Sequence, residues 1–438
     1  MTPVVLNGVT TLAHLGVIRA EGPDAAGFLH GQLTQDFALL TPSEARLAAL
    51  CTAKGRMIAS FTGIRPSPER VLLVTSRDIL AQTLKRLSMF VLRAKVKLTD
   101  ASDEFALWGI AGTALVVNGL DAMTPPGRRV DAGAASVVSL YPADGIPRAL
   151  WIAPLDAPAP VGDALAPTAW DWSEVRSGIA TLTAPVVEAF VPQMLNYESV
   201  GGVNFKKGCY PGQEVVARSQ FRGTLKRRTY LVTAAGAVEA GQEVFTAQDA
   251  GQPVGTVVQS ASDAQGRWSA LVSMQTSATE AGALHAGGPT GPALTVEPLP
   301  YPCSPTSDPR ARAPWRIASA ASALAAAVAR VLAFAEERLV AHRRPIGVRE
   351  PHVRDVGAVV RLADHQAQRP GQRAAEVASG LRQAHPAQAA VDATGVVGVV
   401  GAALLRHAFA GVVANASNGV SCTVGWFAAR AARQALTL

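Results

Sequence analysis

The stretch Lys206-Lys207-Gly208-Cys209-Tyr210-Pro211-Gly212-Gln213-Glu214 places a cysteine in a basic turn between two glycines. Glycine adopts backbone angles that are closed to other residues, so the thiol can be presented on a tight bend with room for a ligand. Lys206 and Lys207 precede the thiol, Arg218 follows it, and cationic neighbours stabilise a thiolate. Most free cysteines are small buried hydrophobes. The flanking pattern favours a functional thiol over that alternative.

The remaining cysteines do not suggest a disulfide framework or a metal site. Cys51, Cys303 and Cys422 are widely scattered and form no Cys-x-x-Cys pair. No His-Glu-x-x-His, Walker-type or Gly-x-Gly-x-x-Gly run is present either. We therefore expect no metal ligands. The first residues show no basic region followed by an apolar stretch, so we expect no secretory signal and a cytoplasmic location.

The net charge of +7 is concentrated at one end of the chain. Residues 301–438 carry 16 arginines, no lysine and 8 acidic residues, whereas residues 1–300 have a net charge of −1. Because the basic excess is diffuse and lies outside the main body, we expect no direct nucleic-acid binding.

The first 227 residues alternate irregularly between strand and helix patterns, which favours an α+β fold over a regular doubly wound sheet. A strand is expected over residues 12–21, followed by a short helix that contains Phe28 and Leu29. A hairpin is expected next, with strands over Arg46–Ala53 and Met57–Ile64 and a break at Lys54-Gly55. A strand over Val71–Thr75 and a helix over Arg77–Phe90 follow it.

Residues 228–300 change to short runs separated by turns, which predicts a small barrel or sandwich. The five expected strands are Arg228–Thr233, Gln242–Thr246, Pro253–Val258, Trp268–Met274 and Ala293–Glu297. Residues 301–438 form an Ala/Arg-rich tail, in which Ser319–Glu337 could be helical. The apolar run Gly395–Leu405 is too short to span a membrane. The tail is an extra domain, a disordered extension or translation beyond the natural end, and its composition favours the last two.

Two long runs, Phe190–Asn196 and Gly201–Arg218, resemble the signature of the YgfZ family. Phe221-Arg222-Gly223 and the upstream run Phe28–Asp36 also match it. The resemblance covers roughly residues 10–300 and leaves the tail unexplained.

The resemblance implies the three-part ring fold of the aminomethyltransferase, with a folate in a central funnel. It also implies a role in assembling or repairing iron–sulfur clusters in selected enzymes, including radical enzymes that modify tRNA. The expected cofactor is tetrahydrofolate or a derivative, and the expected partners of a monomeric chain are folate and iron–sulfur client enzymes. By the same resemblance, Cys209 is the key thiol, and its setting includes Lys206, Gly208 and Arg218. The implied folate contacts are Trp170, Tyr210, Gln213, Glu214, Gln193 and Asn196.

Trp170 has a physical reason to contact a ligand, because a half-exposed indole can stack on a flat pterin ring. The alternative is that Trp170 and Trp172 only pack in the core. A second family tryptophan would fall near Leu15, where the sequence has no aromatic residue; the adjacent His14 is expected to be an ordinary strand residue.

Two departures from the resemblance concern carboxylates. The aminomethyltransferase has a catalytic Asp after the Lys54-Gly55 turn, where this chain reads Arg56-Met57-Ile58-Ala59-Ser60. It also has a Glu where Arg176 stands here. These differences argue against aminomethyl transfer and favour an accessory factor that works through Cys209. Folate-dependent one-carbon transfer and a scaffold with an inert thiol remain as alternatives.

Overall fold

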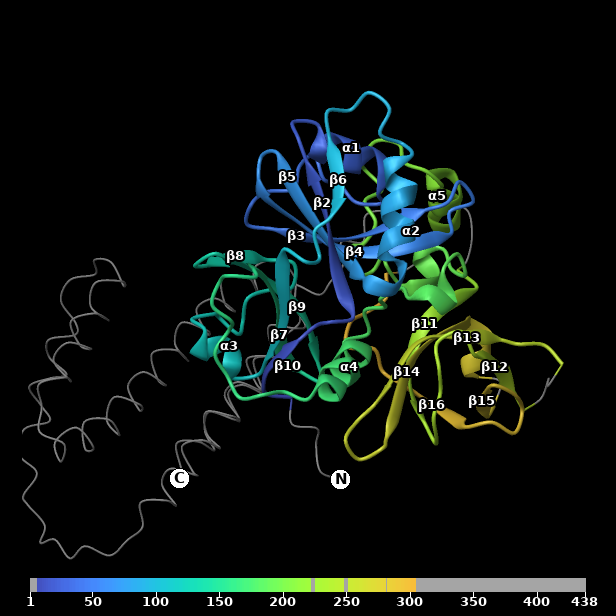
Figure 1. Ribbon diagram of the computed structural model, residues 1–438. Helices are drawn as coiled ribbons and strands as arrows, with labels where there is room; N and C mark the ends of the chain where they lie inside the picture. Colours follow the sequence, from blue (N-terminus) through green and yellow to red (C-terminus); the bar gives the residue numbers. More distant parts are fainter. Residues whose placement is uncertain (1–5, 222–224, 248–250, 281, 305–438) are drawn as a thin grey trace, which may run out of the picture. The chain divides into compact units, whose positions relative to one another are not determined.

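The computed structural model describes residues 6–221, 225–247, 251–280 and 282–304 (Figure 1). The sequence predictions for Ser319–Glu337, for Gly395–Leu405 and for the rest of the tail beyond residue 304 lie outside this part.

The first sheet is antiparallel and has the order β3-β4-β5-β2-β6. Its hairpin turns at Lys54-Gly55 as predicted, and the two helices pack on it (Figure 1). Its apolar side chains, with those of α1 and α2, form most of the largest core cluster. The elements are β2 (Leu15–Glu21), α1 (Ala25–Gln32), β3 (Ala45–Cys51), β4 (Met57–Ser67), β5 (Arg70–Ser76), α2 (Arg77–Ser88) and β6 (Lys97–Asp100).

The second sheet, with the order β1-β7-β10-β9-β8, contains the first strand of the described chain. The chain therefore passes from this sheet to the first one through a turn at Ala13-His14. The strand expected over residues 12–21 was wrong at its start, and His14 is a turn residue. The elements are β1 (Gly8–Thr11), β7 (Phe105–Ala111), α3 (Ala114–Val117), β8 (Arg129–Ala132), β9 (Ala135–Ala143) and β10 (Ile146–Pro154).

The C-terminal part is a closed barrel with the order β11-β14-β13-β12-β15-β16, which decides between the barrel and the sandwich. The five predicted strands are present, but the three-residue β15 was missed because it is too short for a periodic pattern. The α+β class and the C-terminal barrel are therefore confirmed. The elements are β11 (Arg227–Ala234), β12 (Glu243–Thr246), β13 (Gly255–Ser262), β14 (Trp268–Gln275), η3 (Thr276–Thr279), β15 (Leu284–Ala286) and β16 (Ala293–Glu297).

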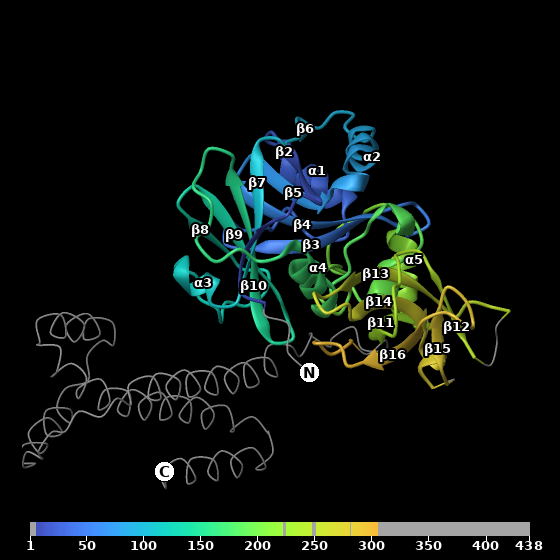
Figure 2. The same ribbon diagram turned by 60° about the horizontal axis from the view of Figure 1, so that its bottom comes forward.

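A connecting segment joins the sheets to the barrel, and its first helix packs against β13 and β14 (Figure 2). Trp170 and Trp172 lie two positions apart on this helix and enter different cores. Tyr301 follows β16 and is buried, with its hydroxyl donating to the carbonyl of Gly178 at 2.8 Å, so the packed part extends past residue 300. The segment contains α4 (Pro167–Arg176), η1 (Ala184–Val186), η2 (Pro192–Leu195) and α5 (Gln213–Phe221). Within the described residues, no helix is both long and apolar enough to cross a membrane.

Candidate functional site

Cys209 is exposed on the loop that connects η2 to α5. Gly212 has a φ of +79°, as the bend requires, and it packs against the tip of the β3–β4 hairpin. Gly208 does not adopt a left-handed conformation, contrary to expectation; a β-carbon there would instead lie 3.4 Å from Nε2 of His30. The loop is thus held between the hairpin and the end of α1, and its thiol remains accessible.

Lys207, rather than Lys206, is the cation that the fold buries beside this loop. Its Nζ donates hydrogen bonds to the carbonyls of Leu33 (2.9 Å) and His30 at the end of α1, where carbonyls lack helical partners. It also lies 4.5 Å from the ring centroid of Tyr210. Burial lowers the pKa of Lys207 to about 8, although the charges of Asp36 and Cys209 oppose this. Lys207 therefore places a positive charge near the thiol.

His30 and Asp36 form a second polar pair beside the loop, with Nδ1 of the imidazole 3.0 Å from Oδ1 of the carboxylate. Burial alone would raise the pKa of Asp36, but the backbone N–H of Leu39, His30 and the charge of Arg46 lower it. Both residues lie in or just after α1, whose sequence run carried part of the family resemblance.

The other predicted site residues fall into two groups. Lys206, Glu214 and Arg218 are on the loop and on the outer side of α5, and Gln213 is half-buried at the start of α5. Gln193 and Asn196 are completely buried. Gln193 donates to the carbonyl of Val216 on α5 (2.7 Å), and Asn196 donates to the carbonyl of Thr229 on β11 (2.8 Å). These last two side chains connect the segment to α5 and the barrel, and a folate contact for either stays a prediction.

A pocket of about 100 Å³ lies between the two sheets and α4. Trp170 lines it, but among the described residues none of the loop from 201 to 212 does. The hydroxyl of Thr75, which also lines it, is buried without a hydrogen-bond partner. The other lining residues include Leu12, Leu15, Ser60, Phe61, Leu140, Arg148, Glu174 and Thr181.

Trp170 is only 1% exposed, so the expectation of a half-exposed indole was wrong. The guanidinium of Arg148 lies 5.1 Å from its ring centroid, and a β-carbon at Gly109 would lie 2.6 Å from its ring atoms. Its Nε1 donates to Oε1 of Glu174 at 3.1 Å. The indole is packed in the core and orients a carboxylate at the pocket wall.

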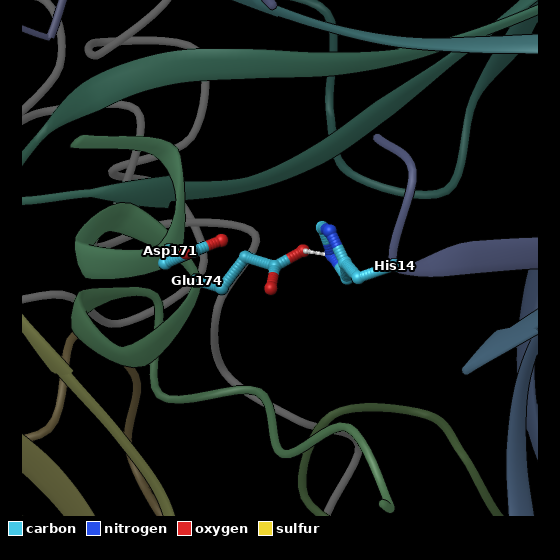
Figure 3. Close-up of side chains that lie close together, drawn as sticks. All are labelled: His14, Asp171 and Glu174. Atoms are coloured by element: carbon cyan, nitrogen blue, oxygen red, sulfur yellow. Dashed lines mark hydrogen bonds and ion pairs between the residues drawn. The ribbon is translucent and has the colours of Figure 1, made fainter. Parts of the chain in front are cut away.

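Glu174, His14 and Asp171 form a cluster that the sequence analysis did not identify (Figure 3). Oε1 of Glu174 lies 3.4 Å from Nε2 of His14. Burial would lower the pKa of His14, but the hydrogen bond and charge of Glu174 raise it. Burial and the charge of Glu174 raise the pKa of Asp171. Asp171 and Glu174 are three apart in a helical segment, which is a usable signal, but His14 is 160 residues from Glu174 and only folding brings it there.

Arg56, in the stretch where the aminomethyltransferase was expected to carry its Asp, and Arg176, at the position of the expected Glu, both have structural partners. Arg176 pairs with Asp144 (2.8 Å) and Glu297 (2.5 Å), which connects α4 to the second sheet and to the barrel. Arg56 donates to the carbonyl of Ala189 at 2.5 Å. Neither position offers a carboxylate for an amine.

Comparison with known proteins agrees with the motifs. Residues 6–116 match the model of the GCVT N-terminal domain. The tRNA-modifying protein YgfZ of Klebsiella pneumoniae (strain 342) is 31% identical over 314 residues, covering 66% of this chain and 92% of that protein. The YgfZ of Edwardsiella ictaluri (strain 93-146) is 34% identical over 230 residues, covering 49% of this chain and 67% of that protein. Among solved structures, the glycine cleavage system aminomethyltransferase T from Bartonella henselae is 16% identical with a TM-score of 0.48, over 67% of this chain and 85% of that one. From the match over nearly the whole length of the Klebsiella protein, this chain belongs to the YgfZ family.

Proposed function

We propose that this chain is a folate-binding accessory protein that supports synthesis or repair of iron–sulfur clusters in selected enzymes, including tRNA-modifying radical enzymes. It would act in the cytoplasm as a monomer, through the thiolate of Cys209 and without binding nucleic acid directly. The single observation that carries the proposal is the exposed thiol on a loop beside the buried Lys207. The relatives are named tRNA-modifying proteins, which supports the choice of client enzymes.

The pocket beside Trp170 supports the folate part of the proposal. It is concave, mostly apolar and contains a few polar groups, as small-molecule sites generally are. The unpaired hydroxyl of Thr75 is a buried polar group that a bound heterocycle would satisfy. These residues would hold part of tetrahydrofolate or a derivative, which would supply one-carbon or redox chemistry when bound. Because the indole of Trp170 is packed in the core, its ring would not stack on the folate. It would contact the folate with its edge and position Glu174 through its hydrogen bond.

The thiol is tested by complementation in a strain that lacks its own protein of this type. Cys209→Ser is expected to abolish tRNA thiolation by the radical enzyme, whereas Cys303→Ser, at a half-buried cysteine, is expected to restore it. Full rescue by Cys209→Ser would refute the thiol mechanism and favour a scaffold. Because Tyr301 is packed, a chain ending after Ser304 tests whether the tail is required.

Folate-dependent aminomethyl transfer is the alternative function, and the arginine partners described above argue against it. Incubation of the chain with tetrahydrofolate and a methylated amine, with an electron acceptor, is expected to form no methylene-tetrahydrofolate. Its formation at a rate that depends on the chain would restore the enzyme hypothesis.

A further inference from the structure

His14, Asp171 and Glu174 bring three metal-ligating side chains together from distant parts of the sequence (Figure 3). Asp171 and Glu174 are three residues apart on α4 and therefore share one face of that helix. His14 comes from the turn where the chain crosses between the two sheets. One ligand atom from each residue lies within 4.8 Å of the others.

The charge of buried Glu174 is compensated by His14, by the charge of Arg148 and by the indole N–H of Trp170. Its side chain is only 16% exposed, and its one ion-pair partner among the described residues is His14, which is charged only when protonated. Arg148 is close, but its guanidinium donates to the carbonyl of Tyr141 and to the hydroxyl of Ser173. A buried carboxylate is expensive unless it is paired or coordinates a metal, and Asp171 adds a second negative charge on the same side. This second negative charge makes the cluster suited to receive a cation.

We propose that His14, Asp171 and Glu174 bind a divalent transition-metal ion of the manganese-to-zinc series. One imidazole nitrogen with two carboxylates suits such ions, whereas Mg²⁺ prefers oxygen ligands alone. Three protein ligands leave at least one coordination position open for water or another molecule, as catalytic zinc sites do. Glu174 also lines the pocket, so the open position would lie at the edge of that pocket. This site goes beyond the proposed function and does not depend on it.

The indole N–H of Trp170 supports the site from outside. It donates to Oε1 of Glu174, and such partners fix the orientation of ligating carboxylates. The rival explanation is a simple ion pair between protonated His14 and Glu174, which would need no metal.

The test is a calorimetric titration of the full chain with Zn²⁺ in a Cys209→Ser background, so that the exposed thiol cannot bind the ion. Histidines in the tail contribute equally to every variant. Glu174→Gln, which keeps the shape of the side chain, and His14→Gln, at an exposed residue, are each expected to remove one Zn²⁺ site. The matched control is His30→Gln: His30 also pairs with a carboxylate, but that pair is not part of any three-residue metal-ligating group in the described chain.

An unchanged number of Zn²⁺ sites in His14→Gln overturns the proposal and leaves the ion pair as the explanation. Equal affinity for Mg²⁺ and Zn²⁺ at this site would refute the assignment to transition metals. Because the readout is metal binding and not tRNA thiolation, failure of this proposal can be distinguished from failure of the proposed function. A circular dichroism spectrum of each variant verifies that the fold is retained.

Discussion

Gly55 and Gly212 are in direct contact: a β-carbon added to Gly212 would lie 2.7 Å from Cα of Gly55 and 2.4 Å from the carbonyl oxygen of Thr52. Gly55 forms the tip of the β3–β4 hairpin, and Gly212 ends the loop that carries Cys209. Both have positive φ, of +71° and +79°. The close approach of these two glycines therefore helps to hold the thiol loop in position.

Gly212→Ala is expected to destabilise the chain much more than Gly201→Ala. Gly201 has nearly the same φ of +78°, but nothing lies within 4 Å of its added β-carbon. Left-handed strain alone costs about 1–2 kcal/mol, whereas overpacking at Gly212 adds about 1–3 kcal/mol. Urea denaturation of both variants measures the difference. Equal losses would show that the hairpin can move away from the loop.

Lys207→Met is expected to lower both stability and thiol reactivity, in contrast to Lys206→Met. The first substitution leaves the carbonyls of His30 and Leu33 without the ammonium donor, which costs about 1–3 kcal/mol for a buried acceptor. The exposed Lys206 should change stability by less than about 0.5 kcal/mol. Urea denaturation and the rate of Cys209 alkylation by iodoacetamide at pH 7 provide the readouts. Similar alkylation rates in both variants would show that Lys207 does not influence the reactivity of Cys209.

The low pKa of Lys207 predicts a pH dependence of stability. Burial lowers this pKa from 10.5 to about 8, so between these values the unfolded chain binds the proton that the folded chain has lost. Stability therefore rises with pH across that window, because the unfolded state holds more protons. The difference in unfolding free energy between the original chain and Lys207→Met, followed across that window, isolates this contribution. A difference in unfolding free energy that does not change with pH would contradict the lowered pKa of Lys207.

Thr75→Val is expected to weaken tetrahydrofolate binding, and Thr83→Val serves as its control. Both hydroxyls are buried and unpaired, but only Thr75 lines the pocket. Since neither hydroxyl has a partner to lose, both variants should be as stable as the original chain or slightly more so. Loss of one hydrogen bond to the ligand corresponds to about 1 kcal/mol, or roughly fivefold in Kd. Calorimetric titration measures the affinity; equal weakening in both variants would exclude a specific contact at Thr75.

Local patterns predicted the first sheet and the barrel well. The break at Lys54-Gly55 separates two apolar runs, and the helical face of Ile79, Leu80 and Leu87 is the buried face of α2. The predicted strand began too early, at Leu12. This apolar residue is buried like a residue of the strand, but it precedes the turn at Ala13-His14. Burial there depends on packing between two sheets, which a local pattern does not contain.

The sequence by itself determined the family, the hairpin and the strands of the C-terminal part, because each depends on neighbouring residues. Only the tertiary structure decided that Lys207 is the buried lysine of the pair, since its acceptors at the end of α1 are distant in the sequence. The tertiary structure likewise packed the indole of Trp170 in the core and brought His14 to Glu174. The thiol loop that the sequence identified is thus positioned by contacts from Gly55 and α1, which meet it only when the chain folds.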